Sequence, residues 1–459
     1  MDTYTLPSYR EVLENLDTYA NLERAAPVAE CLDGGSERMG LLMKRLGSPH
    51  AAIPTVHIAG TKGKGSVSHL VAAALSAAGL KTGLYTSPHV NNLRERIVVN
   101  GRPIGEQRFV ETCASVLHEA AEMRKDGMAP SYFEILTATA FVAFANSRVE
   151  AMVLETGLGG RLDATNLPDL RLVAAGLTSI SRDHQEVLGN TLELIAREKA
   201  AIVKKGVPVV TVPQEDGAMH VIHDRAETVR SPLFVVGKDV TVAFRKRPTV
   251  DKPSAGQRLD FETWRNVYPD IPMAMLGAHQ AENAGLALGL VDLFLEYMDR
   301  EPLDSLVLKR AWRGLALPAR MEVVGERPWR IVDGAHNPAS AWAASETMLE
   351  TFSTSDRTLI FGVAADKDWR TMLRILAPLF KRILLTPYDS PRSVPAAEMA
   401  AYLEREFPGC NPVSALDAYQ ALEMAEEKTP GSGLILTTGS LYLAGEMRML
   451  ASREKVGKA

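Results

Sequence analysis

Residues 55–66 have the sequence Thr-Val-His-Ile-Ala-Gly-Thr-Lys-Gly-Lys-Gly-Ser, and an apolar segment, residues 67–78, follows them. This order predicts a strand, a phosphate loop and the N-terminus of a helix. The glycines let backbone N–H groups point into one concavity, where Lys64 adds positive charge and Ser66 a hydroxyl for phosphate or magnesium. The spacing differs from the eight-residue P-loop, because Ile58 stands where that loop has its first glycine. We expect a nucleotide-phosphate site; the alternative is a glycine-rich turn without a ligand.

The composition is that of an ordinary globular protein. The 459 residues are 46% hydrophobic and 23% charged, and the formal net charge is −5. This length predicts two unequal domains, and the charge offers no general attraction for nucleic acid or an anionic membrane. Cys31, Cys113 and Cys410 lie far apart without metal spacing, which favours packing residues in a reducing cytoplasm. The first thirty residues contain no signal-peptide core, and no apolar run reaches a membrane span of about 20 residues. We therefore expect a soluble, cytoplasmic protein.

Several predicted strands of the first part end in polar residues. The strand at 81–85 leads to Ser87, the strand at 150–155 ends on Glu155 before a glycine-rich run, and the strand at 170–180 leads to Asp183 and His184. Helices separate several of these strands, which predicts a largely parallel sheet with ligand-capable residues along its carboxyl edge. The remaining expectations here are helices at 8–23, 36–46, 105–124 and 132–146, with Ser8 as an N-cap, and a small hairpin over 94–101.

The helix predicted at 191–204 carries a lysine on its apolar stripe. Leu192, Ile195, Lys199 and Ile202 are spaced three, four and three residues apart. One interpretation is that the stem of Lys199 packs while its ammonium reaches solvent. The other is that burial favours the neutral amine, which can form a carbamate with carbon dioxide and then ligate magnesium.

The second part of the chain repeats the alternation of strands and helices. We expect short strands over 206–250, β-structure over 251–272, an apolar helix from about 276 to 297, and a linker at 299–304. Further strands are predicted near 329–332, 358–363, 382–386 and 433–438. The predicted fold is α/β: a P-loop-type, mostly parallel sheet domain at residues 1–303, followed by a smaller Rossmann-like α/β domain at 304–459.

Separate motifs, in order along the chain, resemble those of folylpolyglutamate synthase/dihydrofolate synthase, a branch of the Mur ligase superfamily. They are Gly60–Ser66, Tyr85–His89, Leu154–Asn166, Asp183-His184, Arg197–Ala200, His279–Asn283, Asp333–Pro338 and Thr438–Tyr442. The resemblance spans roughly residues 35 to 450 and implies an ATP-dependent amide ligase that adds L-glutamate to folates through an acyl phosphate. A second activity on dihydropteroate is left open. The resemblance further implies ATP, Mg²⁺ at two sites, small-molecule substrates and a monomer that binds neither nucleic acid nor membrane.

The resemblance also assigns roles to individual residues. Those implied for ATP are Thr61, Lys62, Gly63, Lys64, Gly65, Ser66, Asn283, Arg320, Asp333 and His336, where Asn283, Arg320 and Asp333 are expected to contact it across the domain cleft. The implied metal ligands are Ser87, Glu155, His184 and a carbamylated Lys199. The implied catalytic residues are Lys64, Lys199, His184 and Glu155. Those near the pterin and substrate carboxylate are Ser131, Tyr132, Phe133, Glu134, Leu162, Asp163 and Ala164.

Two other functions remain as alternatives. A ligase of the peptidoglycan type uses the same ATP chemistry on a UDP-linked acid, but it would bring an amino-terminal UDP-binding domain, and only about fifty residues precede the phosphate loop. A nucleotide-binding regulatory ATPase would bind ATP without ligating anything. Turnover that needs neither folate nor glutamate would favour the regulatory ATPase.

Overall fold

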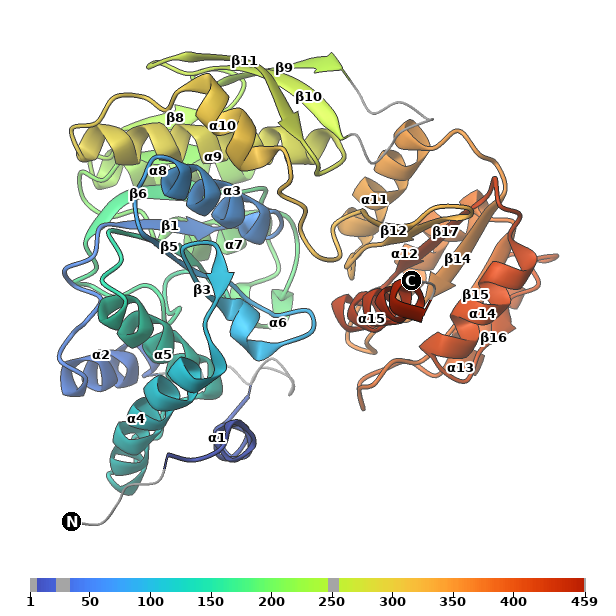
Figure 1. The fold of residues 1–459 in the computed structure, drawn as a ribbon, viewed down its shortest axis with the longest axis horizontal. Coiled ribbons are helices and arrows are strands. Elements are labelled where there is room, and N and C mark those ends of the chain that lie inside the picture. Colours follow the sequence, from blue (N-terminus) through green and yellow to red (C-terminus); the bar gives the residue numbers. More distant parts are fainter. Residues whose placement is uncertain (1–5, 22–33, 247–255, 458–459) are drawn as a thin grey trace. The chain divides into compact units, whose positions relative to one another are not determined.

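The computed structural model describes residues 6–21, 34–246 and 256–457, and these form two compact units (Figure 1). Unit 1 comprises the described residues of Met1–Ala243, Asp260–Pro269 and Glu282–Trp312, and unit 2 those of Phe244–Leu259, Asp270–Ala281 and Arg313–Ala459. The domain boundary expected after residue 303 remains a prediction. Cys31 and residues 247–255, for which expectations were stated above, lie outside the described residues. No helix in the described part is long and apolar enough to cross a membrane.

The sheet of unit 1 has eight strands in the order β4-β3-β2-β5-β1-β6-β7-β8. Neighbours from β2 to β8 pair in parallel, whereas β3 pairs antiparallel with β2 and with β4. The predicted, largely parallel sheet is thus confirmed. The bounds are β1 Thr55–Ala59, β2 Thr82–Tyr85, β3 Ile97–Val99, β4 Arg102–Pro103, β5 Ala151–Glu155, β6 Leu172–Leu177, β7 Val209–Thr211 and β8 Leu233–Val235.

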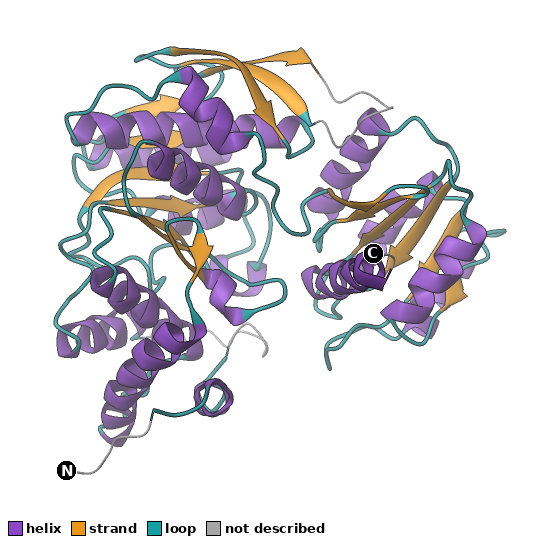
Figure 2. Cartoon of the chain, in the orientation of Figure 1, coloured by secondary structure: helices purple, strands orange, loops and turns teal. Residues whose placement is uncertain are grey.

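Helices of unit 1 cover this sheet (Figure 2). Ala59 and Leu177 of the sheet share one apolar cluster with the buried residues of α7 and α8. Leu290 of α9 lies against Gly176 of β6, whose neighbour along the strand, Leu177, belongs to that cluster, so successive residues face opposite layers. The helices are α1 Tyr9–Leu16, α2 Gly35–Arg45, α3 Lys64–Ala77, α4 Glu106–Lys125, α5 Tyr132–Asn146, α6 Gln185–Leu188, α7 Leu192–Ala200, α8 Asp216–Thr228, α9 Ala278–Tyr297 and α10 Ser305–Trp312.

Most of the predicted elements are confirmed, but four differ. Helix α1 ends at Leu16, well short of the predicted residue 23. Residues 93–96 form a 3-10 helix, η2 Leu93–Arg96, so the hairpin consists only of β3 and β4 around Asn100 and Gly101. Helix α7 ends at Ala200 rather than at residue 204, because the next amides bond to carbonyls three residues back, which turns Ile202 and Val203 into the core. Helix α8 was missed entirely. The predicted N-cap of α1 is confirmed, since the Ser8 hydroxyl accepts a hydrogen bond from the Glu11 amide.

The sheet of unit 2 has six strands in the order β12-β13-β17-β14-β15-β16, and only β12 runs antiparallel to its neighbour. This confirms a second α/β unit. Its strands are β12 Glu322–Gly325, β13 Trp329–Val332, β14 Arg357–Phe361, β15 Arg382–Leu385, β16 Val413–Ser414 and β17 Leu434–Thr438. Its helices are α11 Pro338–Thr351, α12 Trp369–Leu376, η4 Ala377–Leu379, α13 Ala396–Glu406, α14 Ala418–Lys428 and α15 Leu441–Gly457. A separate three-stranded sheet, β11-β10-β9, comprises β9 Thr241–Lys246, β10 Gln257–Glu262 and β11 Val267–Met273.

Candidate active site

Four neighbouring strands of unit 1 deliver the predicted polar residues to one edge of the sheet. Their order is β2-β5-β1-β6, and all three pairs are parallel. Because parallel strands end on the same side, the segments after them are adjacent. Ser87 follows β2, Glu155 ends β5, the phosphate loop follows β1, and the pair Asp183-His184 follows β6. Residues far apart in the sequence are thereby collected into one site.

The phosphate loop has a conformation that glycine alone tolerates at two positions. Gly60 has φ +151°, and a Cβ there would lie 1.8 Å from the Thr178 hydroxyl oxygen. Gly63 has φ +87°, and its Cβ would lie 2.5 Å from Oδ1 of Asn283. A side chain at either position would therefore collide with its neighbour as well as strain the backbone. Asn283, predicted from the resemblance, thus lies against the loop inside unit 1.

Hydrogen bonds fix the phosphate loop to the segment after β6. The Thr61 amide donates to the Ser179 carbonyl at 2.8 Å, and the Thr61 hydroxyl donates to the Ser181 carbonyl at 3.0 Å. Lys62 follows in the loop, where burial lowers its pKa to about 8 while the negative charge of Asp183 opposes that change. The loop is therefore held in place independently of any ligand.

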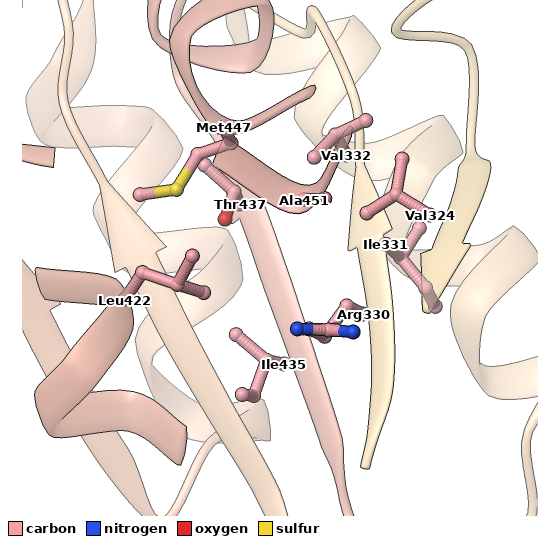
Figure 3. A pocket seen from close by; sticks show the side chains of 9 residues that line it. All are labelled: Val324, Arg330, Ile331, Val332, Leu422, Ile435, Thr437, Met447 and Ala451. Atoms are coloured by element: carbon pink, nitrogen blue, oxygen red, sulfur yellow. The ribbon is translucent and has the colours of Figure 1, made fainter. Parts of the chain in front are cut away.

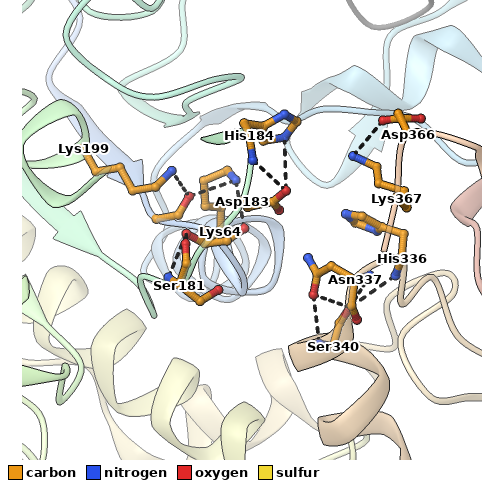
Figure 4. Close-up of polar contacts among 12 residues, drawn as sticks. Lys64, Ser181, Asp183, His184, Lys199, His336, Asn337, Ser340, Asp366 and Lys367 are labelled. Atoms are coloured by element: carbon orange, nitrogen blue, oxygen red, sulfur yellow. Dashed lines mark hydrogen bonds and ion pairs between the residues drawn. The ribbon is translucent and has the colours of Figure 1, made fainter. Parts of the chain in front are cut away.

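The side-chain nitrogens of two lysines converge on one carbonyl of the loop (Figure 4). Nζ of Lys64 lies 3.2 Å, and Nζ of Lys199 2.9 Å, from the Gly60 carbonyl oxygen. Lys199 is only 4% exposed, so the interpretation in which its ammonium reaches solvent is wrong. Burial lowers the pKa of Lys199 to about 7, and the positive charge of Lys64 acts in the same direction. The positive charge and the N-terminus of α3 together make this edge suited to phosphate.

Glu155 lies between α3, the helix after the phosphate loop, and the segment after β2. Its carboxylate accepts a hydrogen bond from the Ser87 amide at 3.2 Å, and a Cβ added to Gly65 would lie 3.4 Å from Oε2 of Glu155. The side chain is buried, and so is the Ser66 hydroxyl one position further along α3. A carboxylate and hydroxyl oxygens beside a phosphate loop are donors of the kind that Mg²⁺ prefers. The donor set therefore fits the predicted metal.

His184 begins the short helix α6 in a left-handed conformation with φ +48°. Its amide donates to Oδ1 of Asp183 at 3.0 Å, and its ring nitrogen Nε2 lies 3.9 Å from the same oxygen (Figure 4). The side chain of His184 is 40% exposed and that of Asp183 14%. The imidazole thus stays accessible at the sheet edge, beside the Asp183 carboxylate.

The loop after β5, residues 157–166, is here called the glycine loop. A Cβ at Gly157 would lie 2.4 Å from the Phe133 ring, and one at Gly160 would lie 2.6 Å from the Glu198 carbonyl oxygen. The loop therefore packs closely on both α5 and α7. The carboxylate of Asp163 holds the loop together, because it accepts hydrogen bonds from the amides of Leu158 at 2.8 Å and Thr165 at 3.0 Å. Burial raises the pKa of this carboxyl, against the effect of these hydrogen bonds.

The predicted substrate residues of α5 form its N-terminus. The Ser131 hydroxyl accepts from the Glu134 amide, and the Glu134 carboxylate accepts from the Ser131 amide at 2.6 Å, which is a capping box. Glu134 is also paired with Arg38 of α2 at 3.2 Å. Tyr132 is buried in the core, whereas Phe133 is half-buried beside the glycine loop. Glu134 therefore has a structural role whatever it does for a substrate.

In unit 2, Asp333, Gly334 and His336 follow β13. Asp333 accepts hydrogen bonds from the amides of Met321 at 2.8 Å and Ala335 at 2.9 Å, and burial raises its pKa although Arg320 acts in the opposite direction. The ring nitrogen Nδ1 of His336 lies 2.9 Å from the Gly334 carbonyl oxygen, next to the cap of α11 drawn in Figure 4. Arg320, just before β12, lies close to this turn, since a Cβ added to Gly334 would lie 2.8 Å from its guanidinium. The ATP contacts expected of these residues remain a prediction.

Two other features lie apart from these residues. A small cavity inside unit 2, lined by apolar side chains together with Arg330 and Thr437, contains none of the predicted site residues (Figure 3). Within the described ranges, the only cluster of three His, Cys, Asp or Glu side chains with metal-ligand spacing is His223, Asp224 and Glu227, which are exposed on α8. Neither feature resembles the sheet-edge site.

Sequence reasoning missed several residues that shape the site. Arg38 and Glu198 were not singled out, although Glu198 precedes Lys199 directly and its side chain pairs with Arg161 of the glycine loop at 2.8 Å. Also missed was His57, the third residue of β1, whose ring contacts Thr165 at 2.8 Å. A polar residue inside an otherwise apolar strand was the available signal for His57.

Comparison with known proteins identifies the class to which the chain belongs. The model of the Mur ligase middle domain matches residues 58–291, and that of the Mur ligase glutamate ligase domain matches residues 319–441. These two matches define the class as the Mur ligases. Within that class, the chain belongs to the folylpolyglutamate synthase/dihydrofolate synthase family, and it is an ATP-dependent ligase of folate metabolism.

Individual relatives support the family assignment. The chain is 35% identical over 421 residues to a dihydrofolate synthase/folylpolyglutamate synthase of Bacillus subtilis, covering 90% of this chain and 94% of that protein. A crystal structure of Mycobacterium tuberculosis folylpolyglutamate synthase complexed with ADP and AMPPCP superimposes with a TM-score of 0.86 at 31% identity, covering 97% of this chain and 98% of that one. E. coli FolC in complex with DHPP and ADP gives a TM-score of 0.83 at 25% identity, over 98% of this chain and all of that one (100%).

Proposed function

We propose that this ligase transfers the γ-phosphoryl group of ATP to a carboxylate of folate and then joins the activated carboxyl to L-glutamate. In the first step the carboxylate oxygen bonds to the γ-phosphorus and ADP leaves, giving an acyl phosphate. In the second step the glutamate amine, after losing a proton, attacks the acyl carbon, and inorganic phosphate leaves. The observation that supports this proposal is the strand order β2-β5-β1-β6, which brings the phosphate loop, Glu155, Ser87 and His184 to one sheet edge.

The phosphate loop would hold the triphosphate. We assign its contacts to Thr61, Lys62, Gly63, Lys64, Gly65 and Ser66, with Asn283 beside them. Phosphoryl transfer depends on positioning and on neutralising charge, and the loop supplies both, since its backbone is already fixed and the Lys64 ammonium lies at the Gly60 carbonyl. Arg320, Asp333 and His336 of unit 2 are proposed as further ATP contacts.

The metal ligands are proposed to be Ser87, Glu155, His184 and carbamylated Lys199, serving two Mg²⁺ sites. Bound magnesium neutralises phosphate charge in reactions of this class. Lys199 fits a carbamate because its buried amine has a pKa of about 7 and is therefore substantially neutral near physiological pH. Glu155 is held by the Ser87 amide, which keeps its carboxylate facing the N-terminal turn of α3.

The pterin ring and the substrate carboxylate are proposed to bind at the N-terminus of α5 and the glycine loop. The residues concerned are Ser131, Tyr132, Phe133, Glu134, Leu162, Asp163 and Ala164. The close contact of Gly157 with Phe133 joins these two segments into one surface. Glu134 and Asp163 would act there chiefly by fixing the backbone, because both carboxylates already accept hydrogen bonds within the protein.

The acceptor could be folate alone or dihydropteroate as well. The B. subtilis relative carries both activities in its name, and the E. coli structure was determined with DHPP. We propose polyglutamylation of folates as the main activity and dihydrofolate synthesis as a second one. A monomeric state and a cytoplasmic location are proposed alongside, from the resemblance and the composition.

The test is ADP release by the purified protein with Mg-ATP and glutamate, in the presence of dihydropteroate, tetrahydrofolate or no acceptor, with products identified by mass. Products gaining one glutamate from both acceptors would establish two activities, and product from tetrahydrofolate alone would restrict the enzyme to polyglutamylation. ADP release that needs no acceptor and yields no amide would instead support a regulatory ATPase and overturn the proposal.

A further inference from the structure

His57 is a polar residue at an apolar position. It is the middle residue of β1, fully buried, and its strand neighbours Val56 and Ile58 are apolar and buried too. Its ring nitrogen Nε2 lies 2.8 Å from the hydroxyl oxygen of Thr165 in the glycine loop, 108 residues away in sequence. Its other ring nitrogen, Nδ1, is buried and has no hydrogen-bond partner among the described residues. Burying an imidazole costs free energy of folding that an aliphatic side chain at the same position would not cost. The presence of a histidine here therefore needs an explanation.

The hydrogen bond has a defined direction. The Thr165 hydroxyl is a short hydrogen-bond partner of Oδ1 of Asp163, and the same carboxylate accepts from the amides of Leu158 and Thr165. A carboxylate that faces three donors accepts from all of them, so the Thr165 hydrogen points to Asp163. The Thr165 oxygen must then accept from His57, which places the imidazole proton on Nε2. Burial lowers the pKa of His57 to about 3, so the ring is neutral at pH values near 7.

We propose that His57 is a positioning residue for the substrate: through Thr165 it holds Asp163, and so fixes the glycine loop to the strand that carries the phosphate loop. The proposal rests on the proposed function, in which residues 162–164 of this loop lie near the pterin and the substrate carboxylate. The hydrogen bonds from His57 to Thr165 and from Thr165 to Asp163 join the glycine loop to β1 through side chains as well as through the backbone. Without this link the loop would spend part of the time outside its binding conformation. The apparent affinity for substrate falls in proportion to the fraction of molecules whose loop is in that conformation.

The phosphate loop is held by different contacts. Thr61 bonds to Ser179 and Ser181 after β6, and none of these hydrogen bonds involves His57. Loss of the His57 hydrogen bond should therefore weaken binding of the acceptor substrate and leave binding of ATP intact. A purely structural role in the core would have no such selectivity.

Four variants separate these roles. His57→Phe removes the donor at similar size, whereas His57→Gln places an amide N–H near the position of Nε2 and should restore function in part. Thr165→Val removes the hydroxyl that bonds to His57. This variant can still test the proposal if His57→Phe does not fold. The matched control is Thr55→Val, which is on the same strand, is equally buried and loses only a local hydrogen bond to the Ile53 carbonyl.

The first measurement is the KM for tetrahydrofolate and the Kd for a nonhydrolysable ATP analogue in the full-length chain. We expect His57→Phe and Thr165→Val each to raise the folate KM about tenfold, with the Kd for the ATP analogue changed by less than about twofold. The double variant should be no worse than either single one, because both remove one link. Equal losses for folate and ATP, or losses matched by Thr55→Val, would overturn the proposal.

The second measurement does not depend on activity. Hydrogen–deuterium exchange at the Leu158 and Thr165 amides should accelerate in His57→Phe and Thr165→Val, while exchange in β6 stays as in the unaltered protein. If the chain failed to use any folate acceptor, the proposed function would fall, but faster loop exchange would still establish that His57 holds the loop. Unchanged exchange in both variants would refute that role.

Discussion

Replacing Lys199 by alanine should abolish ligation, for a reason that the structure lets us quantify. The amine has a pKa of about 7 instead of the ordinary 10.5, because it is buried and lies near Lys64. At about pH 7.5 such an amine is about three quarters neutral, whereas an ordinary lysine is about one thousandth neutral. Only the neutral form reacts with carbon dioxide, so Lys199 is several hundredfold better prepared for carbamate formation than an exposed lysine, by this order-of-magnitude comparison.

The sign of the pH dependence follows from the same pKa. As the pH falls through about 7 the amine gains its proton, and at about pH 6 only about one tenth is neutral. At constant dissolved carbon dioxide, the rate of carbamate formation should decrease by nearly tenfold between pH 7.5 and 6. The amount of carbamate at equilibrium, and the activity that depends on it, should fall further, because forming the carbamate also releases a proton. The carbamate signal is measured by carbon-13 NMR after labelling with bicarbonate, with activity assayed in parallel.

Matched variants complete the Lys199 experiment. Lys199→Ala should lose the labelled signal and at least about a hundredfold in kcat, and added acetate should restore part of the activity by supplying a free carboxylate. The control is Lys205→Ala, since Lys205 is exposed just beyond α7 and should change neither measurement. Absence of a carbamate signal in the unaltered protein from pH 6 to 8, or full activity of Lys199→Ala, would refute the reasoning.

Two further predictions concern the same unit. Lys64→Ala and Glu155→Gln should each reduce ligation by about a hundredfold or more without unfolding, which activity assays and circular dichroism check together; normal turnover in either folded variant would contradict the assigned roles. Gly157→Ala should cost about 1–3 kcal/mol, because its Cβ would lie 2.4 Å from the Phe133 ring, whereas Gly40→Ala, in open space within α2, should gain about 0.5–1 kcal/mol. Thermal melting compares the two glycine variants, and equal shifts would argue against the close contact.

Local sequence was sufficient for much of the site. The passage from an apolar strand into glycines, Lys64 and Ser66 predicted the strand, loop and helix that the structure contains, because each step depends on the backbone freedom or charge of those residues. The spacing of Leu192, Ile195 and Lys199 likewise placed the lysine on a buried helix face. Periodicity failed at α8, where Ala218, Ile222 and Ala226 form the buried stripe. Two small alanines in that stripe made the helical pattern weak.

By itself, the sequence determined the motifs, their order and the family they belong to, since these depend on residue type and spacing along the chain. Only the tertiary structure decided which residues meet. The order β2-β5-β1-β6 makes neighbours of segments that end at Ser87, Glu155 and His184, and strand order is set by packing between distant parts of the chain. For the same reason the contact of His57 with Thr165 could not be foreseen, because it joins residues 108 positions apart through a loop whose path depends on close contacts at its glycines.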